Sequence, residues 1–83
     1  MSTTDELRAQ VLEVLGAIAP DADLATLPDD ASLRDELDLD SMDVQGLVVG
    51  LYEATGVDVP ERDYGKLDTV AACVAYLAAH RTS

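Results

Sequence analysis

The sequence predicts an all-α fold that occupies residues 1–83 as one domain. The chain is 83 residues long, and folding units typically run from about 50 to 200 residues, so a second domain would not fit. Its apolar residues are mostly Leu, Val and Ala, with no Phe or Trp, and such side chains build a core from many small contacts between helices. Apolar residues also recur in three segments at the three- and four-residue spacing of an amphipathic helix.

The first predicted helix covers residues 5–19, and a long loop follows it. In this helix the apolar positions fall on one face, which comprises Leu7, Val11, Leu12, Leu15 and Ile18. Pro20 then prevents the chain from continuing as a helix. Residues 20–39 contain two prolines and many aspartates, so we expect mainly loop, with one helical turn over residues 32–37.

The second main helix is predicted to begin at Ser41. Asp40 is suited to its N-cap position, with Asp43 at the spacing of a capping box. Gly46 and Gly50 lie inside the helix, where each costs roughly 0.5 to 1 kcal/mol relative to alanine. A close packing contact or a docking surface would explain these glycines, and so would simple tolerance. The apolar stripe of the helix comprises Val44, Leu47, Val48 and Leu51.

A short helical turn and a third main helix complete the chain. The turn is expected over residues 61–64 and ends at Gly65. The last helix is expected over residues 68–80, with Asp68 or Thr69 as its cap and an apolar face of Val70, Val74 and Leu77. The predicted architecture is therefore a four-helix bundle of three main helices and one short helix, with a long loop between the first two helices.

The charge balance limits the partners that the chain can bind. Five basic and seventeen acidic side chains give a formal net charge of −12, which opposes binding to nucleic acid or to anionic membranes. A partner with a basic surface is the natural expectation.

No segment approaches the roughly 18 apolar residues of a membrane span, and the single cysteine, Cys73, fits a reducing compartment. We therefore expect a soluble, cytoplasmic and monomeric protein.

One serine, Ser41, stands among carboxylates in the segment DLDSMD, residues 38–43. A catalytic serine needs a nearby base, but the chain has one histidine, His80, near its C-terminal end, and it has no G-x-S-x-G motif. A calcium-binding loop counted from residue 38 lacks the required glycine and glutamate, so we expect no specific metal site. Ser41 is therefore either an ordinary helix-start residue or an attachment point, because a helix N-terminus is accessible and favours a bound phosphate.

The segment around Ser41 resembles the Asp-Ser-Leu-Asp signature of the acyl carrier protein family. The resemblance extends in order from about Leu7 to Leu77, and it includes residues 37–39, 47–51, 56–60, 67–70 and 76–77. It implies a bundle of three main helices plus a short one, which is not itself an enzyme. It also implies that a Mg²⁺-dependent phosphopantetheinyl transferase moves 4′-phosphopantetheine from coenzyme A onto Ser41. The thiol of this arm would then carry acyl groups as thioesters, and the chain would act as a stand-alone acyl carrier protein.

The remaining site residues follow from this resemblance and from position. Asp40 and Asp43 are expected to help the transferase to recognise the chain. Met42, Val44 and Leu47 are expected to form a docking surface. The partners implied for that surface are acyl-loading, condensing or acyltransferase enzymes with basic docking patches.

Two departures from the family pattern bear on the pathway. Met42 replaces the usual leucine, which is a near-isosteric change. Gly46 and Tyr52 occupy positions that are acidic in fatty-acid carriers, which indicates a more apolar docking face. This favours polyketide or other specialised biosynthesis over fatty acid biosynthesis. An aminoacyl or peptidyl carrier is the alternative within the family, and an unmodified acidic helical interaction module is the alternative outside it.

Several other residues that could carry chemistry are expected to be structural. Cys73 is expected to be a small buried hydrophobe, and His80 is expected to cap the last helix. Tyr52, Tyr64 and Tyr76 are expected to pack against the bundle with exposed hydroxyl groups rather than to form a binding surface.

Overall fold

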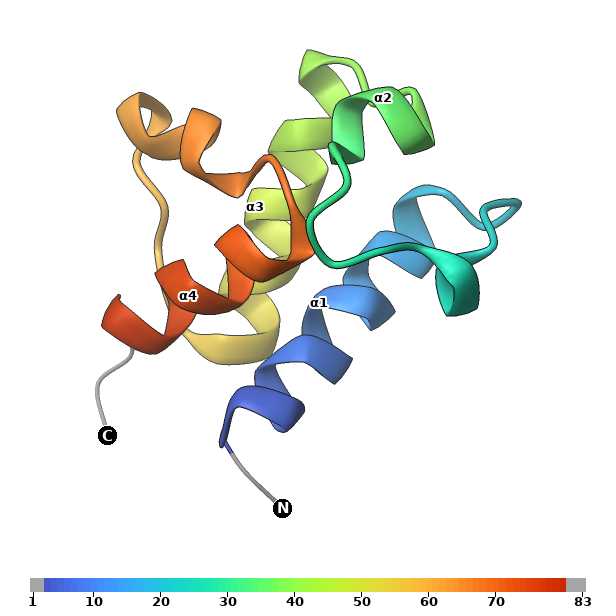
Figure 1. The fold of residues 1–83 in the computed structure, drawn as a ribbon. Coiled ribbons are helices and arrows are strands. Elements are labelled where there is room, and N and C mark those ends of the chain that lie inside the picture. Colours follow the sequence, from blue (N-terminus) through green and yellow to red (C-terminus); the bar gives the residue numbers. More distant parts are fainter. Residues whose placement is uncertain (1–2, 81–83) are drawn as a thin grey trace.

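The structure is a computed structural model that describes residues 3–80, and every regular element in that range is a helix (Figure 1). In chain order the elements are α1 (Thr3–Ile18), η1 (Leu24–Thr26), α2 (Leu33–Leu37), α3 (Ser41–Thr55), η2 (Glu61–Leu67) and α4 (Val70–His80). The three long helices α1, α3 and α4 form the bundle, and η2 is the additional short helix. The predicted all-α fold is confirmed.

Helix α1 packs against both α3 and α4, and the apolar stripes of these helices form the core. On α1 the buried residues are Leu7, Val11 and Leu15, which lie at the predicted helical spacing. Within residues 3–80 every buried side chain is Leu or Val, apart from Cys73 and Tyr76. Burial of each Leu or Val contributes about 1.5 to 3 kcal/mol, so aliphatic contacts dominate the stability of the bundle. None of the helices in this range is both long enough and apolar enough to span a bilayer.

The long loop between α1 and α3 is anchored by apolar side chains and by backbone hydrogen bonds. It contains η1, which was not expected, and α2, which matches the predicted helical turn. Leu33 and Leu39 bury their side chains in the core. The Leu33 amide donates to the Asp68 carbonyl (2.8 Å), and the Ala71 amide donates to the Asp29 carbonyl (2.9 Å). These bonds attach the loop to the start of α4.

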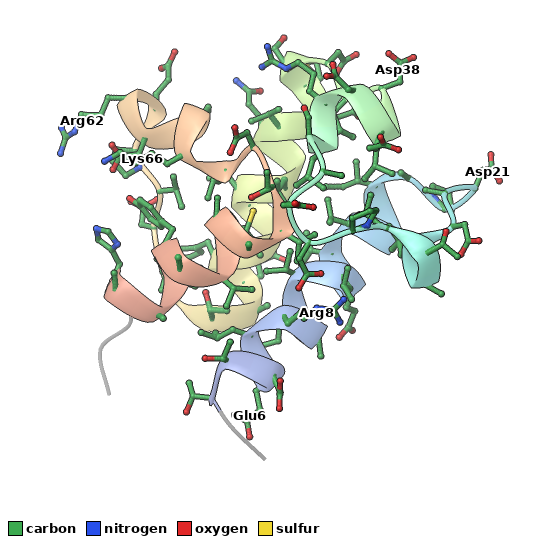
Figure 2. The ribbon with its side chains drawn as sticks, in the orientation of Figure 1. Glu6, Arg8, Asp21, Asp38, Arg62 and Lys66 are labelled. Carbon is green, nitrogen blue, oxygen red and sulfur yellow. The ribbon has the colours of Figure 1, made fainter. Side chains whose placement is uncertain are left out.

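A forked ion pair joins the same loop to α1, through Arg8 (Figure 2). Nε of Arg8 lies 3.1 Å from both carboxylate oxygens of Asp29, and Nη2 lies 2.9 Å from Oδ1. The hydrogen bonds and the positive charge of Arg8 lower the pKa of Asp29. Because both side chains are exposed, the pair contributes little stability and mainly sets the position of the loop.

Two glycines of α3 face α1, but only one of them is required there. A Cβ atom at Gly50 would lie 2.6 Å from Cγ1 of Val14, which is far too close. A Cβ atom at Gly46 would lie 3.9 Å from the side chain of Ile18, which is an ordinary contact. Gly50 therefore reflects the close packing of α1 and α3, one of the explanations that the sequence left open.

The predicted boundaries of η2 and α4 were wrong by a few residues. Helix η2 continues through Gly65 to Leu67, because Gly65 does not adopt the left-handed conformation that commonly ends a helix. Helix α4 begins at Val70, two residues later than predicted. Of the two predicted caps, the structure selects Thr69, whose Oγ1 accepts a hydrogen bond from the Ala72 amide (2.9 Å).

Helix α4 holds several of the residues predicted to be structural. Burial raises the pKa of the Cys73 thiol to about 12, so the thiol stays protonated and acts as a small apolar group. The Tyr76 hydroxyl donates to Oδ2 of Asp63 (2.8 Å), which joins α4 to η2. The ring of His80 stacks on Tyr76, and its Nδ1 lies 3.0 Å from the Tyr76 carbonyl oxygen. The structural roles predicted for Cys73 and His80 are confirmed.

Candidate functional site

Ser41 is the first residue of α3, and its side chain is exposed. The nearby carboxylates form a capping box. The Asp43 amide donates to Oδ1 of Asp40 (2.8 Å), and the Asp40 amide donates to Oδ2 of Asp43 (3.3 Å), so the predicted cap is confirmed. Within residues 3–80 no hydrogen bond engages the Ser41 hydroxyl. The hydroxyl is therefore accessible to another molecule.

The turn before Ser41 is held by a left-handed aspartate and a buried leucine. Asp38 ends α2 with φ 52° and ψ 48°, the left-handed conformation that glycine usually fills. The amides of Asp38 and Leu39 both donate to the Arg34 carbonyl. Leu39 then buries its side chain, so the chain is anchored two residues before Ser41. This anchor fixes the position of Ser41 while leaving its side chain in water.

The residues predicted to form a docking surface fall on different sides of α3. Met42 is 72% exposed, Val44 is half-buried and Leu47 is only 1% exposed. At about 100° per residue, Leu47 lies about 140° around the helix from Met42, on the face that packs into the core. Leu47 therefore does not belong to the surface, and its assignment to the docking surface was wrong.

A different set of α3 residues forms an exposed apolar stripe, here called the α3 stripe, made of Met42, Val49 and Tyr52. Val49 is 55% exposed and Tyr52 is 53% exposed. Tyr52 was expected to pack against the bundle, and this prediction was wrong because Tyr52 lies on the outer face of α3. Seven residues make almost two full turns, so the spacing from Met42 to Val49 was a signal that could have revealed this stripe.

Two adjoining cavities lie beside Ser41, between α2, α3 and η2, and together they are called the Ser41 groove. The smaller cavity, of about 160 Å³, is lined by Ser41, Gln45 and Glu61 together with residues that it shares with the larger one. The shared residues are Arg34, Val44, Tyr64 and Gly65. The larger cavity, of about 280 Å³, reaches the buried side chains of Leu33, Leu39, Leu47 and Leu67. The groove thus leads from Ser41 toward the apolar core.

The charge around Ser41 is mainly negative, and no catalytic base accompanies it. Asp38 and Asp40 are exposed beside it, and Arg34 is the cation that lines the groove. No group of His, Cys, Asp or Glu side chains within residues 3–80 is arranged to hold a metal ion. His80 ends α4 at the far end of the bundle from Ser41 (Figure 1). Because a serine hydrolase needs a base beside its nucleophile, this geometry does not support one.

Three comparisons with known proteins agree on the family. A family profile for the phosphopantetheine attachment site matches residues 5–77. An acyl carrier protein from Rubrobacter xylanophilus is 32% identical over 79 residues, which cover 92% of this chain and 98% of the relative. A solved structure of an acyl carrier protein from Enterococcus faecalis, described for its high thermal stability, is 27% identical with a TM-score of 0.65. That alignment covers 86% of this chain and 98% of the other.

These matches include the segment around Ser41 and the helices that position it. Acyl carrier proteins are carriers rather than enzymes, and they bear covalently attached 4′-phosphopantetheine. They interact with a phosphopantetheinyl transferase and with biosynthetic enzymes. The profile match, the curated relative and the shared helical fold together show that the chain belongs to the acyl carrier protein family.

Proposed function

We propose that Ser41 carries the 4′-phosphopantetheine arm, whose thiol holds acyl groups as thioesters for delivery to partner enzymes. The observation that carries this proposal is the exposed Ser41 hydroxyl, which has no hydrogen-bond partner within residues 3–80. Ser41 also lies inside the range matched by the family profile. The other serine in the described range, Ser32, is already engaged, because its side chain accepts a hydrogen bond from the Asp35 amide (3.4 Å) at the start of α2.

The surroundings of Ser41 suit such an arm. The first amides of a helix have no intrahelical acceptor, and together with the helix dipole they favour a phosphate at this position. The Ser41 groove continues from the hydroxyl to apolar side chains, so it offers partial shelter to a flexible arm. Repulsion from Asp38 and Asp40 opposes the phosphate, but both side chains are exposed and water screens their charge.

Attachment is a group transfer from coenzyme A that a Mg²⁺-dependent transferase catalyses. Oγ of Ser41 forms a bond to the phosphorus of the phosphopantetheine group, and the bond from that phosphorus to the nucleotide part of coenzyme A breaks. The hydroxyl proton passes to a base of the transferase, and adenosine 3′,5′-bisphosphate leaves. This chain supplies the hydroxyl and its position, which is consistent with the lack of a histidine base beside Ser41.

Asp40 and Asp43 have two roles in this proposal. In the capping box each uses one carboxylate oxygen, Oδ1 of Asp40 and Oδ2 of Asp43. The second oxygen of each carboxylate is left for a basic group on the transferase. The two residues would therefore hold the first turn of α3 and mark it for recognition at the same time.

The α3 stripe is the docking surface that we propose for acyl-loading, condensing or acyltransferase enzymes. Its three side chains are exposed on the helix that begins with Ser41, and a group of exposed apolar side chains on one face commonly marks a contact with another protein. Glu53, exposed next to Tyr52, supplies negative charge for a basic rim on the partner. The apolar character of this face supports a role in polyketide or other specialised biosynthesis rather than in fatty acid biosynthesis.

Intact mass spectrometry tests the attachment site directly. The chain is incubated with coenzyme A, Mg²⁺ and a phosphopantetheinyl transferase of broad specificity. We expect a mass gain of one phosphopantetheine group in the wild type and in Ser32→Ala, and no gain in Ser41→Ala. Ser32→Ala is the matched control because it changes another helix-start serine. A gain that persists in Ser41→Ala would overturn the assignment of Ser41.

Mass measurements on the same proteins also distinguish the alternative functions. An unmodified interaction module predicts no mass gain in any variant. An aminoacyl or peptidyl carrier predicts that an adenylating partner loads the arm with an amino acid, whereas the proposed acyl carrier is loaded with an acyl group. The mass of the loaded species distinguishes the two carriers.

A further inference from the structure

Arg34 has no ion-pair partner within residues 3–80, in contrast to Arg8 and Lys66. Arg8 pairs with Asp29, and Lys66 pairs with Asp63 (3.4 Å). Within residues 3–80 the Arg34 side chain makes no ion pair and no hydrogen bond. Its side chain is exposed on the short helix α2 and lines both cavities of the Ser41 groove. The chain has a formal net charge of −12, so a cation that lines the Ser41 groove without an acidic partner requires an explanation.

The backbone holds Arg34 in a defined position relative to Ser41. The Arg34 carbonyl accepts hydrogen bonds from the amides of Asp38 and Leu39, which form the turn that leads to Ser41. Arg34 and Ser41 line the same cavity of about 160 Å³. Glu61 lines this cavity as well, yet it forms no ion pair with Arg34 in the described part of the chain. Arg34 is therefore a cation without an acidic partner in the described range, and it lines the same cavity as Ser41.

We propose that Arg34 is a positioning residue that binds the phosphate linking the arm to Ser41. A guanidinium group presents several N–H donors in a plane, and this arrangement matches the oxygens of a phosphate. Its positive charge would offset part of the repulsion from Asp38 and Asp40. By holding the phosphate at the mouth of the groove, Arg34 would direct the arm along the groove rather than into open water. This inference rests on the proposed role of Ser41.

Nuclear magnetic resonance on the modified protein tests the contact without any assay of turnover. Holo protein is prepared as wild type, Arg34→Gln and Arg62→Gln, and the mass gain is confirmed for each. Arg62 is the matched control because it lies on η2 and its guanidinium points away from the bundle (Figure 2). The ¹⁵N–¹H signals of the arginine Nε groups are compared before and after modification. The ³¹P signal of the arm is compared among the three proteins.

We expect the Nε signal of Arg34 to shift on modification while that of Arg62 stays in place. We also expect the ³¹P signal to move in Arg34→Gln but not in Arg62→Gln. An Arg34 signal that shifts no more than that of Arg62 would overturn the inference. So would a ³¹P signal that is unchanged in Arg34→Gln or that moves equally in both variants, because a general change of charge would explain equal movement.

Failure of this inference and failure of the proposed function have different signatures. If Ser41 does not carry the arm, the wild type shows no Ser41-dependent mass gain. If only the inference about Arg34 fails, all three proteins gain the arm on Ser41 and their arginine and phosphorus signals show no specific contact.

Discussion

Helix α3 presents Leu47 and Leu51 to the core and Met42 and Tyr52 to water, all within the range Ser41–Thr55. The inner face is packed so closely that a methyl group at Gly50 would overlap Val14. The outer face keeps three large apolar side chains exposed, on the helix that begins with the serine that we propose to be modified. On this helix, therefore, an apolar residue does not by itself indicate the core. The inner face supplies stability, and the outer face is available for binding.

The largest expected effect is a difference in the free energy of unfolding between variants of the inner face and variants of the outer face of α3. Leu47→Ala should lower the free energy of unfolding by about 2 to 5 kcal/mol, because it removes buried methyl groups and leaves a cavity. Met42→Ala should change it by about 0.5 kcal/mol or less, because the side chain is largely exposed. Urea denaturation followed by circular dichroism measures both values. Equal losses in the two variants would mean that Met42 is also packed, and the distinction between the faces would fail.

A second pair of variants tests how closely the inner face is packed. Gly50→Ala should lower the free energy of unfolding by about 1 to 2 kcal/mol, because the new methyl group meets the stiff, β-branched side chain of Val14. Gly46→Ala should raise it by about 0.5 to 1 kcal/mol, since it restricts the unfolded chain and meets only an ordinary contact. Thermal melts monitored at 222 nm, a helix signal, show the sign of each change. Stabilisation by Gly50→Ala would contradict the close approach of α1 and α3.

The outer face is tested by its effect on a partner enzyme. Tyr52→Glu should raise the KM of an acyl-loading enzyme for the holo protein by roughly tenfold, because a charged group replaces an apolar contact. Ala75→Glu is the control, since Ala75 is exposed on α4, away from the stripe. Steady-state loading assays on both variants give the KM values. If the two variants show the same KM, the α3 stripe is not the docking surface for that enzyme.

The smallest expected effect concerns the turn that leads to Ser41. Asp38→Gly should raise the free energy of unfolding by about 0.5 to 1 kcal/mol, because glycine adopts the left-handed conformation more readily. Asp38→Ala removes the same charge but should destabilise the protein, since alanine is strained at φ 52°. Urea denaturation of both variants separates backbone strain from charge. Stabilisation of similar size in both would show that relief of charge repulsion, and not the backbone, is the cause.

Features that depend on local chemistry could be predicted from the sequence. The capping box at the start of α3 needs only a three-residue spacing between Asp40 and Asp43, and the structure confirms it. The helical periodicity of α1 likewise identified the buried residues Leu7, Val11 and Leu15. Leu12 and Ile18, which were predicted on the same face, are only partly buried. The exposure of Ser41 follows from the same local signal, because the first residue of a capped helix has little around it.

Contacts between distant segments could not be predicted in the same way. The hydrogen bonds from Leu33 to Asp68 and from Ala71 to Asp29 attach the long loop to the start of α4. The continuation of η2 through Gly65 also differed from the prediction, because Gly65 supplies no left-handed turn. Nothing in a short stretch of sequence states which distant amide and carbonyl will meet or which glycine will adopt a positive φ.

By itself, the sequence determined the all-α class, the places of the main helices and the serine at the start of α3, because spacing and capping act within a few residues. Tertiary packing was needed to show that the face of α3 with Leu47 points to the core while the face with Tyr52 points to water, and that Arg34 lines the same cavity as Ser41. The physical reason is that the rotation of a helix about its axis, and the meeting of two helices, are set by how neighbouring elements pack. Spacing along one helix shows which residues share a face, but only packing shows where that face points.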